Sequence, residues 1–408
     1  MTRNKLYEGK LNIGLSLVLV GVPLGMYLND MYPIVKWSPI IMTLSVLLIF
    51  NWKNLIHLSF PSYSKIYGVL LLFQLICLMY GAFSSNMSGQ YMSFHLFLIA
   101  LCLAISTVSV RTSIFAYPKL IGYVFTVSVV CCILGAYNTF RGRVTGDEVY
   151  MLKQLGEYAI EPFTVAMGSL VNYFAGLMML RVSKFRFFVF FAMLLDVYTI
   201  LFTDKRTPLF VLVVGMLWYL YVNDMLHFSK RMIKGIGLIV LVFVCLYSVD
   251  FFQNKIDYFI ENTYNGVLVL FGDTSVSDAT GSAIERTYSR RWMADYIALN
   301  GSLYSTIFGF GYMTKWLDAP ILQAYLDMGI IGFFFYLYLI VVFPVRIIIK
   351  KYNAPTLVFA LAVSLYSIAS IINSGIPYQY VKYTPVVFLA FCYNVYKKEI
   401  KHRKIKNI

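Results

Sequence analysis

The chain has 408 residues, of which 60% are hydrophobic and only 13% are charged, and its formal net charge is +15. A soluble domain carries roughly 25% charged residues, so this composition excludes one large soluble core and indicates a polytopic membrane protein. The basic charge does not point to nucleic acid, because Lys and Arg gather at the ends of apolar runs, as they do in membrane proteins.

Repeated apolar runs predict an all-α fold with about 12 transmembrane helices in a single membrane domain, residues 1–408. The first run has no convincing small-residue cleavage site, so we expect a helix that is kept and not a signal peptide that is removed. The expected spans are about 11–29, 33–51, 64–83, 91–110, 115–138, 163–181, 185–203, 207–223, 235–252, 320–343, 356–374 and 377–396.

The positive charges predict how these helices are oriented. If the N-terminus is cytoplasmic, 22 of the 34 Lys and Arg lie on the cytoplasmic side, and every even-numbered connection is basic. Because cytoplasmic loops carry an excess of Lys and Arg, both termini are expected to be cytoplasmic. The basic tail KKEIKHRKIKN is then expected to lie near anionic lipid, with binding of a partner as the alternative.

Two of the expected outer loops are enlarged. The first covers residues 139–162, and the second covers residues 251–319, which makes it nearly 70 residues long. A loop of that length has room for short helices of its own. The sequence contains no internal repeat and no separable soluble domain. Any chemistry is expected in residues 281–332, a polar stretch that leads back into an apolar helix.

The sequence lacks the motifs of several enzyme classes. None of the four histidines falls in either outer loop. There is also no cluster of His, Cys and carboxylates at metal-ligand spacing, no Walker A loop and no Gly-x-Ser-x-Gly. The six cysteines all lie in apolar runs, where they are expected to pack and not to form disulfides. We therefore do not expect a hydrolytic ATPase, a zinc enzyme or a serine hydrolase, and no motif in the sequence indicates a cofactor.

Arginines on the outer side are the candidate chemical groups. Lys205 and Arg206 stand in TDKRTP at the outer mouth of the eighth expected helix, and the second outer loop carries Arg286, Arg290 and Arg291. A single Arg at a helix end often only extends its charged group to the membrane–water interface. Several together fit an anion better, because guanidinium groups bind phosphate in bidentate fashion. On this side of a membrane, a lipid phosphate or pyrophosphate is the expected anion.

A glycine-rich stretch and three aspartates are the remaining candidate features of the sequence. FGFGYM (308–313) is too short and apolar for a dinucleotide loop, and we expect a hinge where the backbone approaches a helix. Asp318, two residues before Pro320, either caps a helix or faces the arginines as a functional carboxylate. Asp327 and Asp196 lie within expected spans and should face protein or water, with a structural hydrogen bond as the expected role of Asp196.

These motifs resemble those of the Wzy-type O-antigen polymerases and the related O-antigen ligases. The resemblance rests on Arg206-Thr207 at an outward helix mouth, on Arg290, Trp292 and Gly301 in the second outer loop, and on the glycines and the acidic residue of GFGYMTKWLDAPILQAYLDMGIIGFF, namely Gly309, Gly311, Asp327, Gly329 and Gly332. Its motifs cover about 60 residues, whereas the spans and outer loops cover the whole chain. Where ligases have His-Asn this chain has Asp318-Ala319, a departure that favours polymerase over ligase.

The resemblance implies a metal-independent glycosyltransferase of the bacterial cytoplasmic membrane. Such an enzyme joins undecaprenyl-pyrophosphate-linked oligosaccharide repeat units into O-antigen or capsular chains on the outer face. A chain-length regulator and a flippase of the same pathway are candidate partners besides the bilayer. The alternatives are a flippase or other transporter of lipid-linked oligosaccharide, an O-antigen ligase, and a purely structural or receptor membrane protein.

On physical grounds we assign roles to residues of this chain as a hypothesis, with Arg206, Arg290 and Arg291 on the pyrophosphate. Asp318 is the candidate base or acceptor orienter, with Arg290 and Arg291 as catalytic groups on the pyrophosphate. Further substrate-binding candidates are the basic residues Lys205, Arg206 and Arg286 and the aromatic residues Tyr288, Trp292, Tyr312 and Trp316. The aromatic rings would stack on sugars, and anchoring at the membrane interface is the alternative for them.

Overall fold

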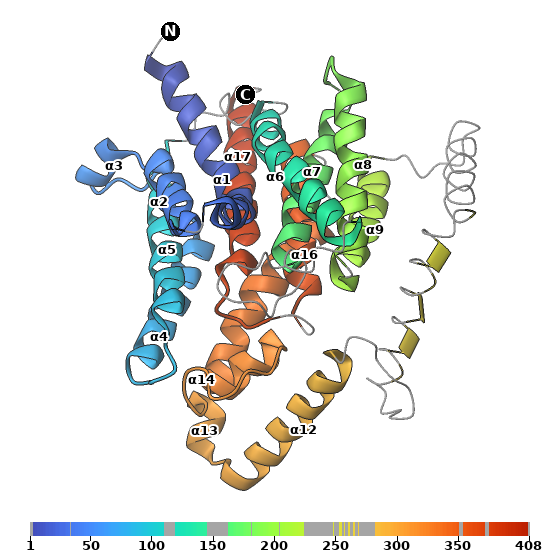
Figure 1. The fold of residues 1–408 in the computed structure, drawn as a ribbon. Coiled ribbons are helices and arrows are strands. Elements are labelled where there is room, and N and C mark those ends of the chain that lie inside the picture. The colour runs from blue at the N-terminus through green and yellow to red at the C-terminus, as the bar shows by residue number, and fades with distance from the viewer. Residues whose placement is uncertain are drawn as a thin grey trace.

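The structure is a computed structural model that describes residues 3–109, 119–144, 162–223 and 282–406, apart from short gaps at 33, 181, 204, 351–353 and 372–374, together with scattered positions between 248 and 268. These residues form helices and loops, and no strand occurs among them (Figure 1). Within the described ranges, five helical segments are long and apolar enough to cross a membrane: Tyr7–Asn29, Lys65–Ala82, Gly89–Ser106, Lys119–Phe140 and Pro320–Ile349. The described part is therefore that of a helical membrane protein.

The first part of the chain forms two helical hairpins. Its helices are α1 (Arg3–Met31), α2 (Trp37–Ile49), the short α3 (Trp52–Ile56), α4 (Lys65–Ala82) and α5 (Gly89–Ser106). α1 packs along α2, and α4 packs along α5. Ser88 stands before α5, and its hydroxyl accepts a hydrogen bond from the N–H of Tyr91 at 3.4 Å. This N-cap ends the α4–α5 connection.

The centre of the bundle is built from helices of both halves of the chain. It contains α6 (Lys119–Val144), α7 (Pro162–Met179), α8 (Arg186–Phe202), α9 (Arg206–Val222), α16 (Pro355–Ala369) and α17 (Thr384–Lys406). α16 packs against α7, α9 and α17, and most of its residues are buried. Asp196 of α8 is fully buried there, and its Oδ2 accepts a 2.6 Å hydrogen bond from Nδ2 of Asn172 on α7. The expected structural role of Asp196 is confirmed.

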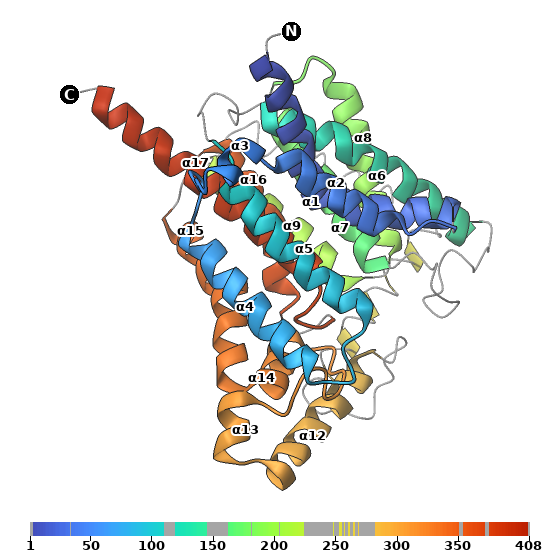
Figure 2. The same ribbon diagram turned by 90° about the vertical axis from the view of Figure 1, so that its left-hand side faces the viewer.

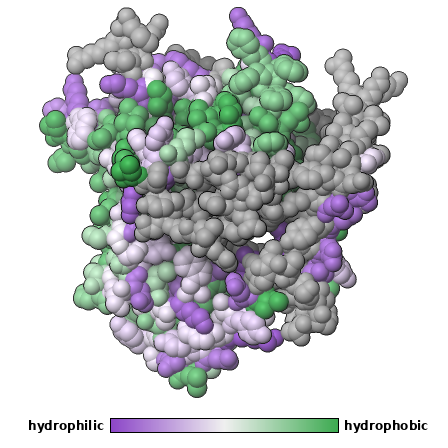
Figure 3. All heavy atoms as spheres, viewed as in Figure 1, coloured by the Kyte–Doolittle hydropathy of each residue, from purple (hydrophilic) through white to green (hydrophobic). Residues whose placement is uncertain are grey.

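A lobe of helices lies at one end of this bundle. It consists of α12 (Ser282–Asn300), α13 (Leu303–Phe308) and the first part of α14 (Pro320–Leu337). Figures 1 and 2 show α12 and α13 at the end of the molecule opposite to the two labelled chain ends. Figure 3 shows mostly apolar, green side chains on the upper part of this face, and paler and purple side chains over the lobe. The lobe is thus the polar end of an apolar bundle.

Every expected span except 235–252, which lies outside the described residues, overlaps a described helix. The number of twelve crossings and their direction stay a prediction. Residues 145–161 of the first enlarged loop lie outside the described residues. In the described part of 251–319, α12 and α13 confirm the expected short helices.

One expected span is not a single regular helix. Gly329 interrupts α14 with φ 63° and ψ −155°, so the helical hydrogen-bond ladder breaks in the middle of the apolar run. A π-helical turn, Tyr338–Val342, follows, and α15 (Phe343–Ile349) completes the segment. The expected span 320–343 overlaps this segment, and its apolar pattern does not indicate the break at Gly329. Only glycine adopts such a positive φ without a steric penalty.

Candidate functional site

The glycine-rich stretch folds back onto the break in α14. The N–H groups of Phe310 and Gly311 donate hydrogen bonds to the carbonyl oxygens of Leu326 and Asp327, at 2.8 and 3.1 Å. A Cβ added to Gly309 would meet the backbone of Asp327, and one added to Gly329 would meet the backbone of Ile307. Each glycine therefore makes room for the other segment, and the loop satisfies carbonyls beside the break. The expected close approach of this backbone to a helix is confirmed.

The buried carboxylate of Asp327 holds the same loop through hydrogen bonds. Its carboxylate is fully buried, as expected from its place in an apolar run. Oδ1 accepts a hydrogen bond from the N–H of Thr314 at 3.1 Å. Oδ2 accepts two more, from Nε2 of Gln323 at 2.9 Å and from the hydroxyl of Tyr378 at 2.7 Å. With three donors directed at it, Asp327 acts as a structural acceptor that holds the loop to α14.

A second buried chain of hydrogen bonds connects the loop to α4 and α5. Nδ1 of His95 lies 2.6 Å from Oε1 of Gln74, and Nε2 of His95 lies 3.0 Å from the hydroxyl of Tyr312. Because an amide oxygen only accepts, Nδ1 carries the hydrogen and Nε2 accepts from Tyr312. The ring of Tyr312 also stacks on Tyr378, with centroids 4.3 Å apart. Burial first of all raises the pKa of the Tyr312 hydroxyl, so it remains a donor.

Asp318 does not cap α14. The residue at the capping position is Ala319, and no side chain makes a capping hydrogen bond there. Asp318 has φ 51°, and its two oxygens accept from Nε of Arg286 at 2.9 Å and from the N–H of Gly375 at 2.5 Å. The capping interpretation is therefore wrong, and the alternative, a carboxylate that faces the arginines, describes the geometry. About a third of its side chain, 34%, is exposed.

The arginines of α12 differ sharply in their surroundings. Arg290 lies one helical turn after Arg286, and its Nε and Nη2 atoms are buried without a hydrogen-bond partner among the residues that the structure describes. Burial, and then the positive charge of Arg286, lower the pKa of Arg290. Arg291 points to the exposed side of the helix. Lys205 and Arg206 begin α9, which packs against α7, α8 and α16. The structure thus brings together Arg286, Arg290 and Asp318.

The four candidate aromatic residues fall into two groups. Tyr312 is buried in the network above, and Trp292 stacks on Tyr296 at 4.8 Å beneath the Lys315 ammonium group, 4.1 Å from its ring centroid. These two hold the loop in place and offer no free face to a sugar. Tyr288 and Trp316 are 65% and 46% exposed, so their rings are open to a solute or to lipid headgroups.

Sequence reasoning missed several residues of this region. Gln74, His95, Tyr378 and Gly375 were not singled out. His95 and Tyr378 contact Tyr312, Gly375 contacts Asp318, and Gln74 holds His95. The available signal was the presence of Gln74 and His95 inside apolar runs, where a polar side chain needs a partner. For Tyr378 and Gly375, in a short connection between α16 and α17, the sequence carries no comparable signal.

Comparison with known proteins adds no relative. Neither a protein-family model, nor a curated protein, nor a solved structure matches the chain. Among the described residues, no group of three or more His, Cys, Asp and Glu is placed to hold a metal ion. Function must therefore be argued from the arginines, the carboxylate and the architecture around them.

Proposed function

We propose that the protein is a glycosyltransferase that joins polyprenyl-pyrophosphate-linked oligosaccharide units into a longer glycan at the outer face of a bacterial cytoplasmic membrane. The product would be an O-antigen or capsular chain. Support comes from the resemblance of the motifs to Wzy-type polymerases and from the position of the arginine helix at the polar end of an apolar bundle. That the membrane is a bacterial cytoplasmic membrane, and that the glycan is an O-antigen or capsular chain, are both parts of this proposal.

One observation carries the proposal above the others. Nε and Nη2 of Arg290 are buried and have no hydrogen-bond partner among the described residues, beside the Arg286–Asp318 pair. A buried donor without an acceptor costs about 1–3 kcal/mol, more when it is charged, and the neighbouring positive charge adds repulsion. An oxyanion between the two guanidinium groups removes both costs. Phosphate and pyrophosphate oxygens match the planar donors of arginine in charge and spacing.

The chemistry follows from these groups. A sugar hydroxyl of the acceptor attacks the anomeric carbon of the donor, and the bond from that carbon to the pyrophosphate oxygen breaks. The bonding electrons leave with the pyrophosphate, whose growing negative charge Arg290 and Arg286 stabilise. The hydroxyl proton passes to Asp318. Each oxygen of that carboxylate accepts one hydrogen bond in the structure, and a carboxylate has about four acceptor sites.

Deletion of the gene, followed by gel analysis of surface glycan, tests the proposal. A lost polymerase leaves a single repeat unit on the acceptor, and the ladder of longer chains disappears. A lost ligase leaves long chains on the lipid carrier, and a lost flippase leaves no product on the outer side. The wild-type gene on a plasmid is the matched control and should restore the ladder. Long chains that persist in the deletion strain would overturn the proposal.

A further inference from the structure

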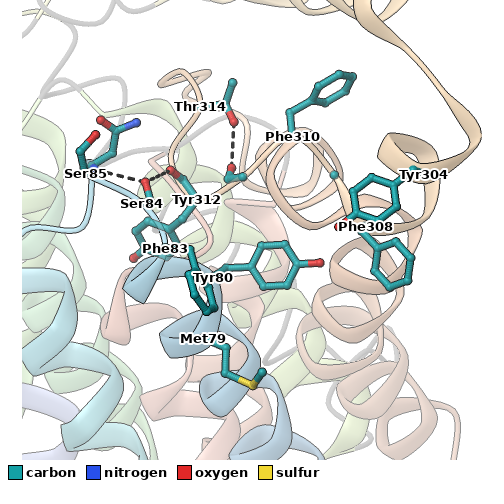
Figure 4. Close-up of a pocket in the computed structure, with 13 residues that line it drawn as sticks. Met79, Tyr80, Phe83, Ser84, Ser85, Tyr304, Phe308, Phe310, Tyr312 and Thr314 are labelled. Atoms are coloured by element: carbon teal, nitrogen blue, oxygen red, sulfur yellow. Dashed lines mark hydrogen bonds between the residues drawn. The ribbon is translucent and has the colours of Figure 1, made fainter.

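A cavity of about 710 Å³ opens at the lobe, and neither Arg286 nor Asp318 is among the residues that line it. One wall is the end of α4 with the connection to α5, and the other is α13 with the glycine-rich loop. In Figure 4 the ring of Tyr80 points across the cavity towards Tyr304 and Phe308. Its volume lies within the range of about 300–1,000 Å³ that is usual for small-ligand sites.

The two walls are joined by hydrogen bonds, although they are far apart in the sequence. The hydroxyl of Ser84 donates to the carbonyl oxygen of Tyr312 at 3.0 Å, and Nδ2 of Asn86 donates to that of Met313, also at 3.0 Å. The loop is held in turn by its backbone bonds to α14. A cavity between fixed walls is preformed, which lowers the entropy cost of binding.

The lining has the chemistry of a carbohydrate site. None of the 13 lining residues is charged, so the cavity has nothing to neutralise a phosphate. Aromatic rings alternate with hydroxyl and amide groups: Tyr80, Phe83, Tyr304 and Phe308 with Ser85 and Asn86. Sugar rings combine apolar C–H faces with hydroxyl groups, and this mixture covers both.

Several of these rings are not used for packing within the protein. Phe83 is 91% exposed and Tyr304 is 71% exposed. Tyr304 and Phe308 lie close to each other on α13, with ring centroids 5.0 Å apart. Exposed aromatic surface that is gathered at a cavity and framed by polar groups marks a binding site.

We propose that this cavity binds the uncharged glycan part of the substrate, separately from the arginines that bind its pyrophosphate. The inference rests on the proposed function for the identity of the glycan. Phe310 connects the two places, since it lines the cavity and its ring also packs edge-on against Tyr296 of the arginine helix α12, with centroids 5.0 Å apart. A saccharide in the cavity therefore lies on one side of the loop, and α12 lies on the other.

The test uses the full chain in lipid nanodiscs and two soluble probes. One probe is the host's oligosaccharide repeat unit, released from its lipid carrier by mild acid, and the other is inorganic pyrophosphate. We expect Tyr304→Ala combined with Phe308→Ala to raise the Kd of the oligosaccharide by about tenfold or more in a ligand-observed NMR titration. The Kd of pyrophosphate should stay the same. Leu303→Ala is the matched control, because Leu303 is an exposed residue of α13 that does not line the cavity.

The outcomes separate this inference from the proposed function. An unchanged oligosaccharide Kd in the double variant, or no binding by the wild type, overturns the glycan cavity even when deletion of the gene abolishes chain extension. If the double variant loses pyrophosphate binding to the same extent, the glycan cavity is not separate from the arginines that bind the pyrophosphate, and that part of the inference is overturned. If the deletion strain keeps its long chains while the double variant alone loses the oligosaccharide, the proposed function is wrong and the saccharide site stands. Equal thermal unfolding of the variant and the control shows that folding is intact.

Discussion

Nε of Arg286 donates a 2.9 Å hydrogen bond to Oδ2 of Asp318, and this contact connects the polar helix α12 to the loop in front of α14. The other carboxylate oxygen accepts from the N–H of Gly375, in the connection between α16 and α17. Three separate segments therefore meet at one side chain. The positive φ of Asp318, 51°, turns the side chain away from the helix start and towards these donors.

Asp318→Asn should reduce the rate of chain extension by about 100-fold or more, the usual size of a general-base contribution. Asparagine tolerates a positive φ, so the backbone of the loop should keep its path. The substitution removes the negative charge, however. It also puts an NH₂ group in place of one carboxylate oxygen, which accepts a hydrogen bond either from Arg286 or from Gly375. Extension assays with the purified full chain measure the rate, and thermal unfolding is the control. If the variant extends chains at the normal rate, Asp318 is not the base and its role is only to hold the loop.

Exchanging the two charges should not restore activity. Arg286→Asp together with Asp318→Arg keeps an ion pair between α12 and the loop, but an arginine cannot accept the hydrogen bond from Gly375. A pair this exposed contributes about 1 kcal/mol or less to stability, so the double variant should still fold. Recovery of chain extension in the double variant, compared with each single variant, would contradict a specific role for the Asp318 carboxylate.

The structure predicts unequal roles for two neighbouring arginines that the sequence treated as equivalent. Arg290→Ala removes the guanidinium with unpartnered, buried Nε and Nη2 atoms and should lower the extension rate by about 100-fold or more. Arg291→Ala removes an exposed group and should lower it only a few-fold. Arg290→Lys should restore little, because an ammonium group lacks the planar pair of donors. Equal losses at positions 290 and 291 would refute this distinction.

Gly309→Ala and Gly329→Ala should each destabilise the protein by about 2 kcal/mol or more. Both positions have a positive φ, and a methyl group at either one meets the backbone of the other segment. Gly89→Ala is the matched control, since nothing lies within 4 Å of its added Cβ. Unfolding temperatures in one detergent measure the difference. If Gly309→Ala unfolds at the wild-type temperature, the close approach of loop and helix is wrong.

The part of the site that the sequence predicted correctly depends on local rules. Glycines spaced Gly-x-Gly indicated a backbone that approaches a helix, and the contact of Gly309 with α14 confirms this. A carboxylate in an apolar run must face protein, and the burial of Asp327 confirms it. Positions of apolar helices follow from the same kind of rule, because a span is a long apolar stretch.

The rest depends on tertiary contacts that one-dimensional patterns do not contain. Asp318 before a proline helix start is a typical cap in sequence, but the loop's packing gives it a positive φ and sends its carboxylate to Arg286. The apolar run around Gly329 does not indicate a break, because the break depends on the approaching loop, which donates hydrogen bonds to the carbonyl oxygens of Leu326 and Asp327. His95 and Tyr312 are more than 200 residues apart, so neither predicts the other.

Asp327→Asn should destabilise the protein by about 1–3 kcal/mol, because either orientation of the amide leaves a buried donor without an acceptor. If the amide oxygen takes the place of Oδ2, its NH₂ group meets the N–H of Thr314. If the amide is reversed, the NH₂ group meets Nε2 of Gln323. Gln323 cannot rotate its own amide without losing the hydrogen bond from the N–H of Leu317 to its Oε1.

Asp295→Asn is the matched control for this change, since Asp295 is an exposed carboxylate on α12, and substitutions at such positions usually change stability by less than about 0.5 kcal/mol. Thermal unfolding of the two variants in the same detergent gives the comparison. Asp327→Asn should unfold several degrees lower, and chain extension should fall with it, because Asp327 positions the loop that carries Asp318. Equal unfolding temperatures would mean that the three donors do not need a carboxylate, and Asp327 would then lose its assigned role as the acceptor that holds the loop to α14.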